Sequence, residues 1–129
     1  MKLDVIPLVS VDSVRFGMTR NEVRALWGKA SEFKKTPEAE TTTDDFGFCH
    51  VYYDENDCCE AIEIFDDADV WIDGGKVFPL AADEMLEAFP QFEEDEDGPI
   101  CADKAMAVYA PDGKAESILL ARRGYFDFG

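Results

Sequence analysis

Cys49, His50, Cys58 and Cys59 are the residues whose types and spacing could do chemistry, because thiols and imidazole bind zinc and thiols act in redox reactions. Zinc takes four converging nitrogen or sulfur ligands, commonly from cysteine pairs separated by about two to four residues. Here the members of each pair are adjacent, and adjacent residues of a β-strand point to opposite faces. At most one residue of each pair could face a common ion, so the spacing favours strand positions over a metal site.

The surroundings of these cysteines also disfavour a redox role. The chain has no C-x-x-C motif, and a disulfide between the neighbours Cys58 and Cys59 would be strained. Eight carboxylates, and no lysine, arginine or histidine, lie from Asp54 to Asp69; such carboxylates raise the pKa of a thiol. We expect thiols at buried or half-buried strand positions, reduced in a cytosolic protein, as for the fourth cysteine, Cys101.

The acidic stretch EEDEDGPICADK resembles part of a calcium-binding loop. Glu93, Asp95 and Asp97 take ligand positions 1, 3 and 5 of such a loop, and Gly98 takes its turn position. Position 12 should be a bidentate glutamate but is Lys104, whose charge opposes Ca²⁺. The pattern allows weak divalent-ion binding by the clustered carboxylates from Glu93 to Asp97, and does not predict a dedicated site.

Residues for catalysis are sparse. His50 is the only histidine, and no serine lies in a nucleophile-elbow motif. Paired carboxylates could act in acid–base catalysis, but a chain with 29 Asp and Glu contains such pairs unavoidably. We therefore predict a protein that is not an enzyme and carries no cofactor.

The net charge of −17 is unevenly distributed along the chain. Residues 1–35 carry seven Lys and Arg against four Asp and Glu, a net of +3, and residues 36–129 carry five against twenty-five, a net of −20. Such a field repels nucleic acid and anionic membranes and steers a basic partner toward the protein. The alternative is that the charge serves solubility alone.

At 129 residues and 47% apolar composition, the chain suits one compact domain with its own core. The N-terminal stretch MKLDVIPLVS has a short apolar run broken by Asp4 and Pro7 and does not resemble a signal peptide. No apolar run approaches the roughly 18 residues that a membrane-spanning helix needs. We expect a cytoplasmic protein.

Two helices are predicted. Thr19 and Glu22 form a capping box at the start of the first, apolar residues then recur on one face, and Gly28 ends it. The second runs from Leu80 to Phe89 and ends at a proline. The stretch EEDEDGP that follows is predicted to be a loop, because clustered like charges repel and cannot pack.

β-rich runs predict hairpins. Residues 46–53 and 58–65 are joined by the turn sequence DEND, and residues 105–110 and 115–122 by PDG, in which proline sets φ and glycine accepts a positive φ. A shorter hairpin is predicted around the glycine pair of DVWIDGGKVF.

The order of helix and then hairpin occurs twice. VYYDENDCCEAIEIF and VYAPDGKAESILLA share Val-Tyr, an acidic turn and Glu-x-Ile, and EVRALW matches EMLEAF with Val23 opposite Met85. We predict the α+β class: one domain over residues 1–129, made of two helix-plus-antiparallel-sheet halves, about 14–65 and 70–126. The helices of this tandem pseudo-repeat are expected to pack on one sheet face.

The segment VRFGMTRNEVRALWG resembles the GM-T-x-x-E-V-x-x-L-G opening shared by the SmpA/OmlA lipoproteins and the β-lactamase inhibitory protein. Those proteins pack short helices against an antiparallel sheet, and the inhibitor does so twice in tandem, which implies a similar (BLIP-like) fold here. The whole chain also resembles small uncharacterised bacterial proteins of the cytosol, and the immunity proteins of polymorphic toxin systems are often of this character. The chain departs from the lipoproteins in having no lipobox-type leader, and from the inhibitor in its cysteine spacing.

Two tyrosines suggest a binding surface. Tyr52 and Tyr109 each follow a valine, Val51 and Val108, and are exposed if those valines are in the core. Tyrosine offers contact area at low entropic cost, and neighbouring carboxylates speed association with a basic partner. The alternative is that the rings pack under the helices or cover the second face of the sheet.

These observations predict a non-enzymatic protein-binding module, an acidic immunity-type inhibitor of a basic effector or toxin. A regulatory or scaffold protein is the alternative, and a metal-binding protein that uses Cys and His or the acidic loop is a third class. The predicted partner-binding residues are Tyr52, Asp54, Glu55, Asp57, Tyr109 and Asp112.

Overall fold

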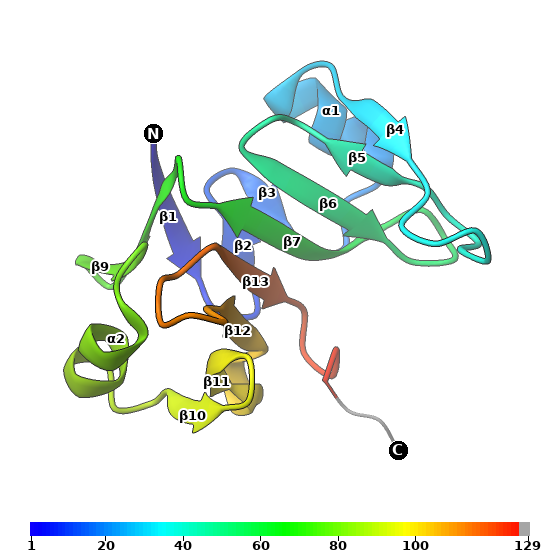
Figure 1. Ribbon diagram of the computed structural model, residues 1–129. Coiled ribbons are helices and arrows are strands. Elements are labelled where there is room, and N and C mark those ends of the chain that lie inside the picture. The colour runs from blue at the N-terminus through cyan, green and yellow to red at the C-terminus, as the bar shows by residue number, and fades with distance from the viewer. Residues whose placement is uncertain (127–129) are drawn as a thin grey trace.

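The computed structural model describes residues 1–126, which form a mixed α+β fold of two sheets and two short α-helices (Figure 1). The strands of the larger sheet are β4 (Ser31–Phe33), β5 (Thr43–Asp45), β6 (Cys49–Tyr53), β7 (Cys59–Phe65), β10 (Glu93–Asp95), β11 (Gly98–Cys101), β12 (Met106–Tyr109) and β13 (Ser117–Ala121). The smaller sheet contains β1 (Lys2–Ile6), β2 (Ser10–Val11), β3 (Val14–Arg15), β8 (Asp69–Ile72) and β9 (Gly75–Phe78). The helices are α1 (Arg20–Trp27), α2 (Ala82–Ala88) and the 3₁₀ turn η1 (Ala102–Lys104).

The eight-stranded sheet consists of two antiparallel meanders joined through their last strands. Its order is β10-β11-β12-β13-β7-β6-β5-β4, with β7 and β13 at the centre. Across this central pair Ile62 faces Leu120, and Ile64 faces Ile118. A helix precedes each meander in the chain, and the two helices lie at opposite ends of the molecule (Figure 1).

A second, five-stranded sheet was not predicted. Its order is β3-β2-β1-β8-β9, and β1 runs parallel to β8, so that Leu3 faces Val70. The predicted hairpin of DVWIDGGKVF is present as β8 and β9, but it belongs to this sheet and not to the second of the predicted halves. The signal for β1 was the alternation of KLDVI, in which Leu3 and Val5 are buried and the residues on either side of them are exposed.

The main core lies between the two sheets. One face of the eight-stranded sheet, the inner face, is buried against the five-stranded sheet, and Val23 of α1 and Met85 of α2 are buried in the same cluster. The inner face contributes Cys49, Val51, Ile62, Ile64, Met106, Val108, Ile118 and Leu120 to this core, and the smaller sheet contributes Leu3, Val5, Val11, Val14, Val70, Val77 and Phe78.

The other predicted elements are mostly confirmed. The helix over 19–28 is present with the capping box of Thr19 and Glu22, and the helix over 80–89 and both long hairpins are present. The loop predicted for EEDEDGP is wrong, because Glu93–Asp95 form the edge strand β10. All three of its side chains are exposed, so they need not pack against anything, and water screens their repulsion. Within residues 1–126, no helix is long and apolar enough to cross a membrane.

Candidate protein-binding site

The second face of the eight-stranded sheet, the outer face, is covered only in part. Glu63 stands at its centre and accepts hydrogen bonds from the hydroxyls of Tyr52 at 2.5 Å and Ser117 at 2.7 Å. These two bonds give the Glu63 carboxylate hydrogen-bond partners from within the chain. The strand register places one row of residues side by side across this face: Glu93, Ile100, Ala107, Leu119, Glu63, His50, Asp45 and Ser31.

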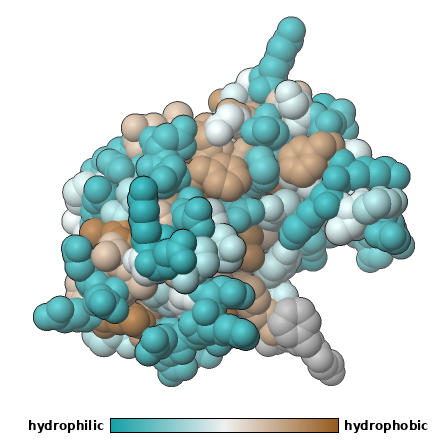
Figure 2. Space-filling model, in the orientation of Figure 1, coloured by the Kyte–Doolittle hydropathy of each residue, from teal (hydrophilic) through white to brown (hydrophobic). Residues whose placement is uncertain are grey.

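Aromatic rings gather on the exposed part of the outer face. His50 packs edge-on between Phe33 and Phe65, with ring centroids 4.9 and 4.7 Å apart. Phe33 is 37% exposed and Tyr109, on β12, is 48% exposed. Figure 2 shows hydrophobic surface interspersed with hydrophilic side chains over the strands of this sheet. Half-exposed rings among polar groups are the composition that protein interfaces favour.

The structure separates the two predicted tyrosines. Val51 and Val108 are in the core as expected, and Tyr109 is exposed, but Tyr52 is only 9% exposed, so its predicted exposure is wrong. The reason is that Tyr52 lies in a small cluster with Ala61 and Ala121, and Tyr125 and Phe126 pack against this cluster.

The predicted acidic residues of the first hairpin have internal partners. Asp54 accepts from the backbone N–H groups of Asn56 and Cys58 and from Arg122 at 2.8 Å, so it shapes the turn. Asp57, whose φ is +61°, accepts from the Arg20 side chain at 2.8 to 3.0 Å.

Glu55 and Asp112, at the tips of the two hairpins, are exposed, and within the described residues no ion pair forms at either. These two carboxylates and Tyr109 are the predicted residues that remain available to a partner.

A buried ionic cluster links α1 to the sheet, and the sequence analysis missed it. The side chain of Asp44 is 0% exposed and accepts from Arg20 at 2.8 Å, from Arg24 at 2.6 and 2.9 Å and from the Tyr53 hydroxyl at 2.9 Å. Burial raises the pKa of Asp44, but hydrogen bonds from Arg24 and Tyr53 and the charges of both arginines outweigh it and leave the pKa below its ordinary value. The spacing of Arg20 and Arg24, four residues apart on one helix face, was the available signal.

The cysteines are free thiols. Cys49, Cys59 and Cys101 are buried and Cys58 is half-buried. Burial, followed by the charge of Glu60, raises the pKa of Cys59 to about 12, and burial also raises the pKa of Cys49. Both thiols are therefore protonated and poor nucleophiles at neutral pH. In the part of the chain that the structure describes, no three His, Cys, Asp or Glu side chains converge as a metal site would require.

A scan against protein-family models and searches of curated proteins and of solved structures found no match. The SmpA/OmlA, BLIP-like and immunity-protein resemblances therefore rest on the sequence motifs alone. The inferences that follow start from the geometry of the outer face and its charges.

Proposed function

We propose that the protein is a non-enzymatic binding module that engages a basic protein through its outer face and acts as an immunity-type inhibitor of that effector. The observation that carries the proposal is the outer face itself: half-exposed aromatic side chains on an open sheet surface, in a chain whose net charge is −17. Inhibition would be by occlusion, because a sheet of this kind can cover a cleft without contributing any chemistry.

The charge argues for a basic partner rather than for a second copy of the chain. Two molecules of net charge −17 repel each other, whereas a cationic protein is attracted and oriented before contact. Charge complementarity mainly raises the association rate, and the buried rings mainly slow dissociation. Glu55 and Asp112 would contribute to the first effect and Tyr109 to the second, while Tyr52, Asp54 and Asp57 hold the surface in shape.

The proposal includes a tandem repeat like that of the β-lactamase inhibitory protein, with halves built from α1 and β4–β7 and from α2 and β10–β13. Matching strand register supports it. Val51 faces Ile62 in the first half and Val108 faces Ile118 in the second, so the Val-Tyr and Glu-x-Ile motifs that the two stretches share occupy corresponding places. Across β7 and β13 the pairs of Ile62 with Leu120 and Ile64 with Ile118 exchange under a two-fold rotation, as two similar halves require.

The test is reconstitution with an identified partner. A protein captured from the native host and identified by mass spectrometry would be purified, and its binding and its toxic or catalytic activity measured with and without this chain. We expect a basic partner whose activity is blocked at one-to-one stoichiometry. Replacing Glu55 with Ser should slow association and flatten its salt dependence.

Two outcomes would count against the proposal. An acidic partner, or a complex in which the partner keeps its full activity, would exclude the inhibitor. Retained activity in a complex that still depends on the outer face would favour the regulatory or scaffold role.

A further inference from the structure

In the first of the two proposed halves, lysine and arginine side chains of the chain itself contact a tyrosine and two carboxylates. The corresponding positions of the second half hold carboxylates. The inference drawn from this difference rests on the proposed function. Tyr52 of β6 pairs with Ala61 of β7, and Tyr109 of β12 pairs with Ser117 of β13. In the first half the Nζ of Lys35 lies 4.4 Å from the centroid of the Tyr52 ring. This is a cation–π contact, since the ring face is electron-rich.

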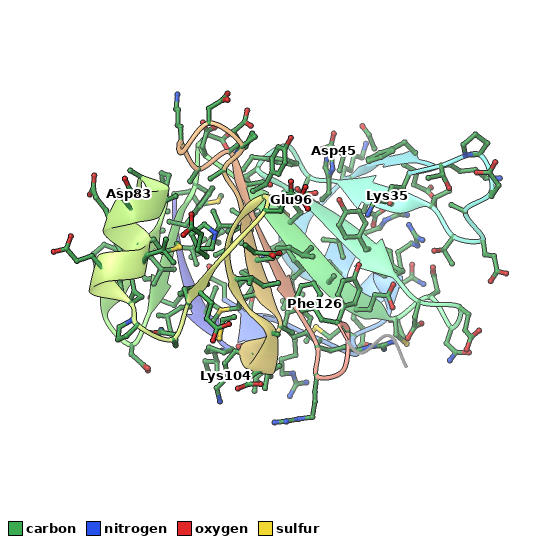
Figure 3. The ribbon with its side chains drawn as sticks, turned by 60° about the horizontal axis from the view of Figure 1, so that its bottom comes forward. Lys35, Asp45, Asp83, Glu96, Lys104 and Phe126 are labelled. Atoms are coloured by element: carbon green, nitrogen blue, oxygen red, sulfur yellow. The ribbon has the colours of Figure 1, made fainter. Side chains whose placement is uncertain are left out.

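A second cation of the first half, Arg122, lies at the end of the central strand pair of β7 and β13. Arg122 lies opposite Glu60, donates its backbone N–H to the Glu60 carbonyl at 3.0 Å, and forms an ion pair with the Glu60 carboxylate at 3.2 Å. Its guanidinium also pairs with Asp54. The first half thus satisfies both its tyrosine ring and its carboxylates from within the chain. Figure 3 shows Lys35 and Phe126, from segments far apart in the sequence, over this end of the sheet.

The second half has carboxylates at the corresponding positions. Continuing the register of β7 and β13 places Asp66 opposite Glu116, where the first half has Arg122 opposite Glu60. Lys35 is the second residue after β4, and the second residue after β10 is Asp97. Charge is reversed at both positions that hold cations in the first half.

The acidic turn is held next to Tyr109. The N–H of Ala110 donates to the carbonyl of Asp97 at 2.7 Å, and the N–H of Glu116 donates to the carbonyl of Tyr109 at 2.8 Å. Gly98 allows this approach, because a Cβ there would lie 2.2 Å from the backbone oxygen of Val108. The backbone of two acidic residues, Asp97 and Glu116, is thus held beside Tyr109, whose side chain is 48% exposed.

The end of the strand pair also has room for a long side chain. Asp66 lines a groove of about 450 Å³ together with Leu80 and Asp112. Lys114 lines the same groove, but within the described residues it makes no ion pair.

We infer that Tyr109, Asp66, Asp97 and Glu116, the second-half site, bind lysine or arginine side chains of the basic partner. The partner would supply in the second half the cations that Lys35 and Arg122 supply in the first. An organic cation fits better than a metal ion, because the site combines an aromatic face, which attracts a guanidinium or ammonium group, with carboxylates that accept its hydrogen bonds.

The experiment titrates an acetylated, amidated tetra-arginine peptide into the ¹⁵N-labelled full chain at low salt and follows amide shifts. We expect the largest shifts at Tyr109, Glu116 and Ser117. Y109L should weaken binding about two- to fivefold, whereas Y109F, which keeps the ring, should bind like the native chain. Shifts centred on β10 or on the first hairpin, or equal affinity for Y109L, would overturn the inference.

A matched control distinguishes binding at this site from general attraction of the peptide to the negative charge of the whole protein. The pair D66N and E116Q removes two charges at the site, and D83N with E84Q removes two on α2, which Figure 3 shows away from the acidic turn that carries Glu96. The first pair should weaken the peptide more than the second, and equal weakening would contradict a specific site. If the peptide binds at the second-half site but no effector is inhibited, only the proposed function is refuted. If an effector is inhibited but binds Y109L as tightly as the native chain, only this site is refuted.

Discussion

Asp44 is the residue through which α1 is joined to the eight-stranded sheet. Its carboxylate receives four hydrogen bonds, from Arg20, from Arg24 twice and from Tyr53, and it is wholly buried. A buried charge is tolerated only where such partners replace water. The charged and polar groups of this cluster hydrogen-bond to one another, which is the arrangement of a structural ion pair.

The first prediction is that D44N lowers the free energy of unfolding by about 3 kcal/mol, because two arginines then lose their anionic partner in a poorly solvated place. Urea denaturation measures it. D45N is the matched control, since the neighbouring Asp45 is 39% exposed and asparagine can still accept the N–H of Gly47. D45N should leave stability unchanged within error, and an equal loss in the two variants would contradict the assignment.

The pH dependence of this difference has a definite sign. The pKa of Asp44 in the folded chain lies below its ordinary value of 3.8, so its contribution is fully present above about pH 4 and is lost as pH falls through the folded pKa. The gap in stability between the native chain and D44N should therefore be constant from pH 7 to about pH 5 and shrink in more acidic solution. A gap that widens on acidification would show that Asp44 is not held as an anion.

Gly98 carries the second prediction. G98A should lower stability by about 1–3 kcal/mol more than G113A does, because both glycines have positive φ but only the Cβ at Gly98 meets backbone, the oxygen of Val108 at 2.2 Å. A Cβ at Gly113 meets nothing within 4 Å, so that variant loses only the conformational preference, about 1 kcal/mol. Thermal or urea denaturation compares the two, and equal losses would mean that the acidic turn moves aside easily.

At the scale of elements, β7 and β13 share the centre of the larger sheet, and the proposed repeat would make them equivalent. The third prediction is that I62A and I118A each lower the free energy of unfolding by about 2–5 kcal/mol and agree within about 1 kcal/mol. Both side chains are fully buried at corresponding register positions. L26A on α1, where Leu26 is 48% exposed, should cost under about 1 kcal/mol. A near-neutral result for one isoleucine alone would contradict equivalent halves.

Most helices and hairpins were predictable because their signals are local in sequence. The features that were not predicted depend on contacts between residues distant in sequence. The capping box of Thr19 and Glu22 and the PDG turn act over a few residues, so both were predictable. The pairing of β1 with β8 joins segments more than sixty residues apart, and nothing within either segment names the other. The burial of Tyr52 likewise depends on Tyr125 and Phe126, which cover it only after the chain has folded.

For the whole molecule, the acidic excess costs stability through repulsion between like charges, and under the proposed function it also speeds association with the partner. The net charge of −17 combines +3 from residues 1–35 with −20 from residues 36–129, so like charges repel one another over the larger part of the chain. The edge strand β10 concentrates three exposed carboxylates, which also discourages edge-to-edge pairing between copies of the chain. Selection for a basic partner would explain why this repulsion is retained.

The last prediction is that salt stabilises the fold. Raising NaCl from about 10 to 300 mM shortens the screening length from about 30 Å to about 6 Å, so long-range repulsion falls while the buried pair of Arg20 and Asp44 is affected little. We expect the melting temperature to rise by about 3–5 °C, a gain of about 1 kcal/mol. The triple variant E93Q, E94Q and D95N removes three of the 17 excess negative charges, leaving −14, and should show a smaller rise. A melting temperature that falls with salt would mean that the surface ion pairs of Arg122 and Lys76 outweigh the repulsion, and that the acidic excess does not destabilise the isolated chain.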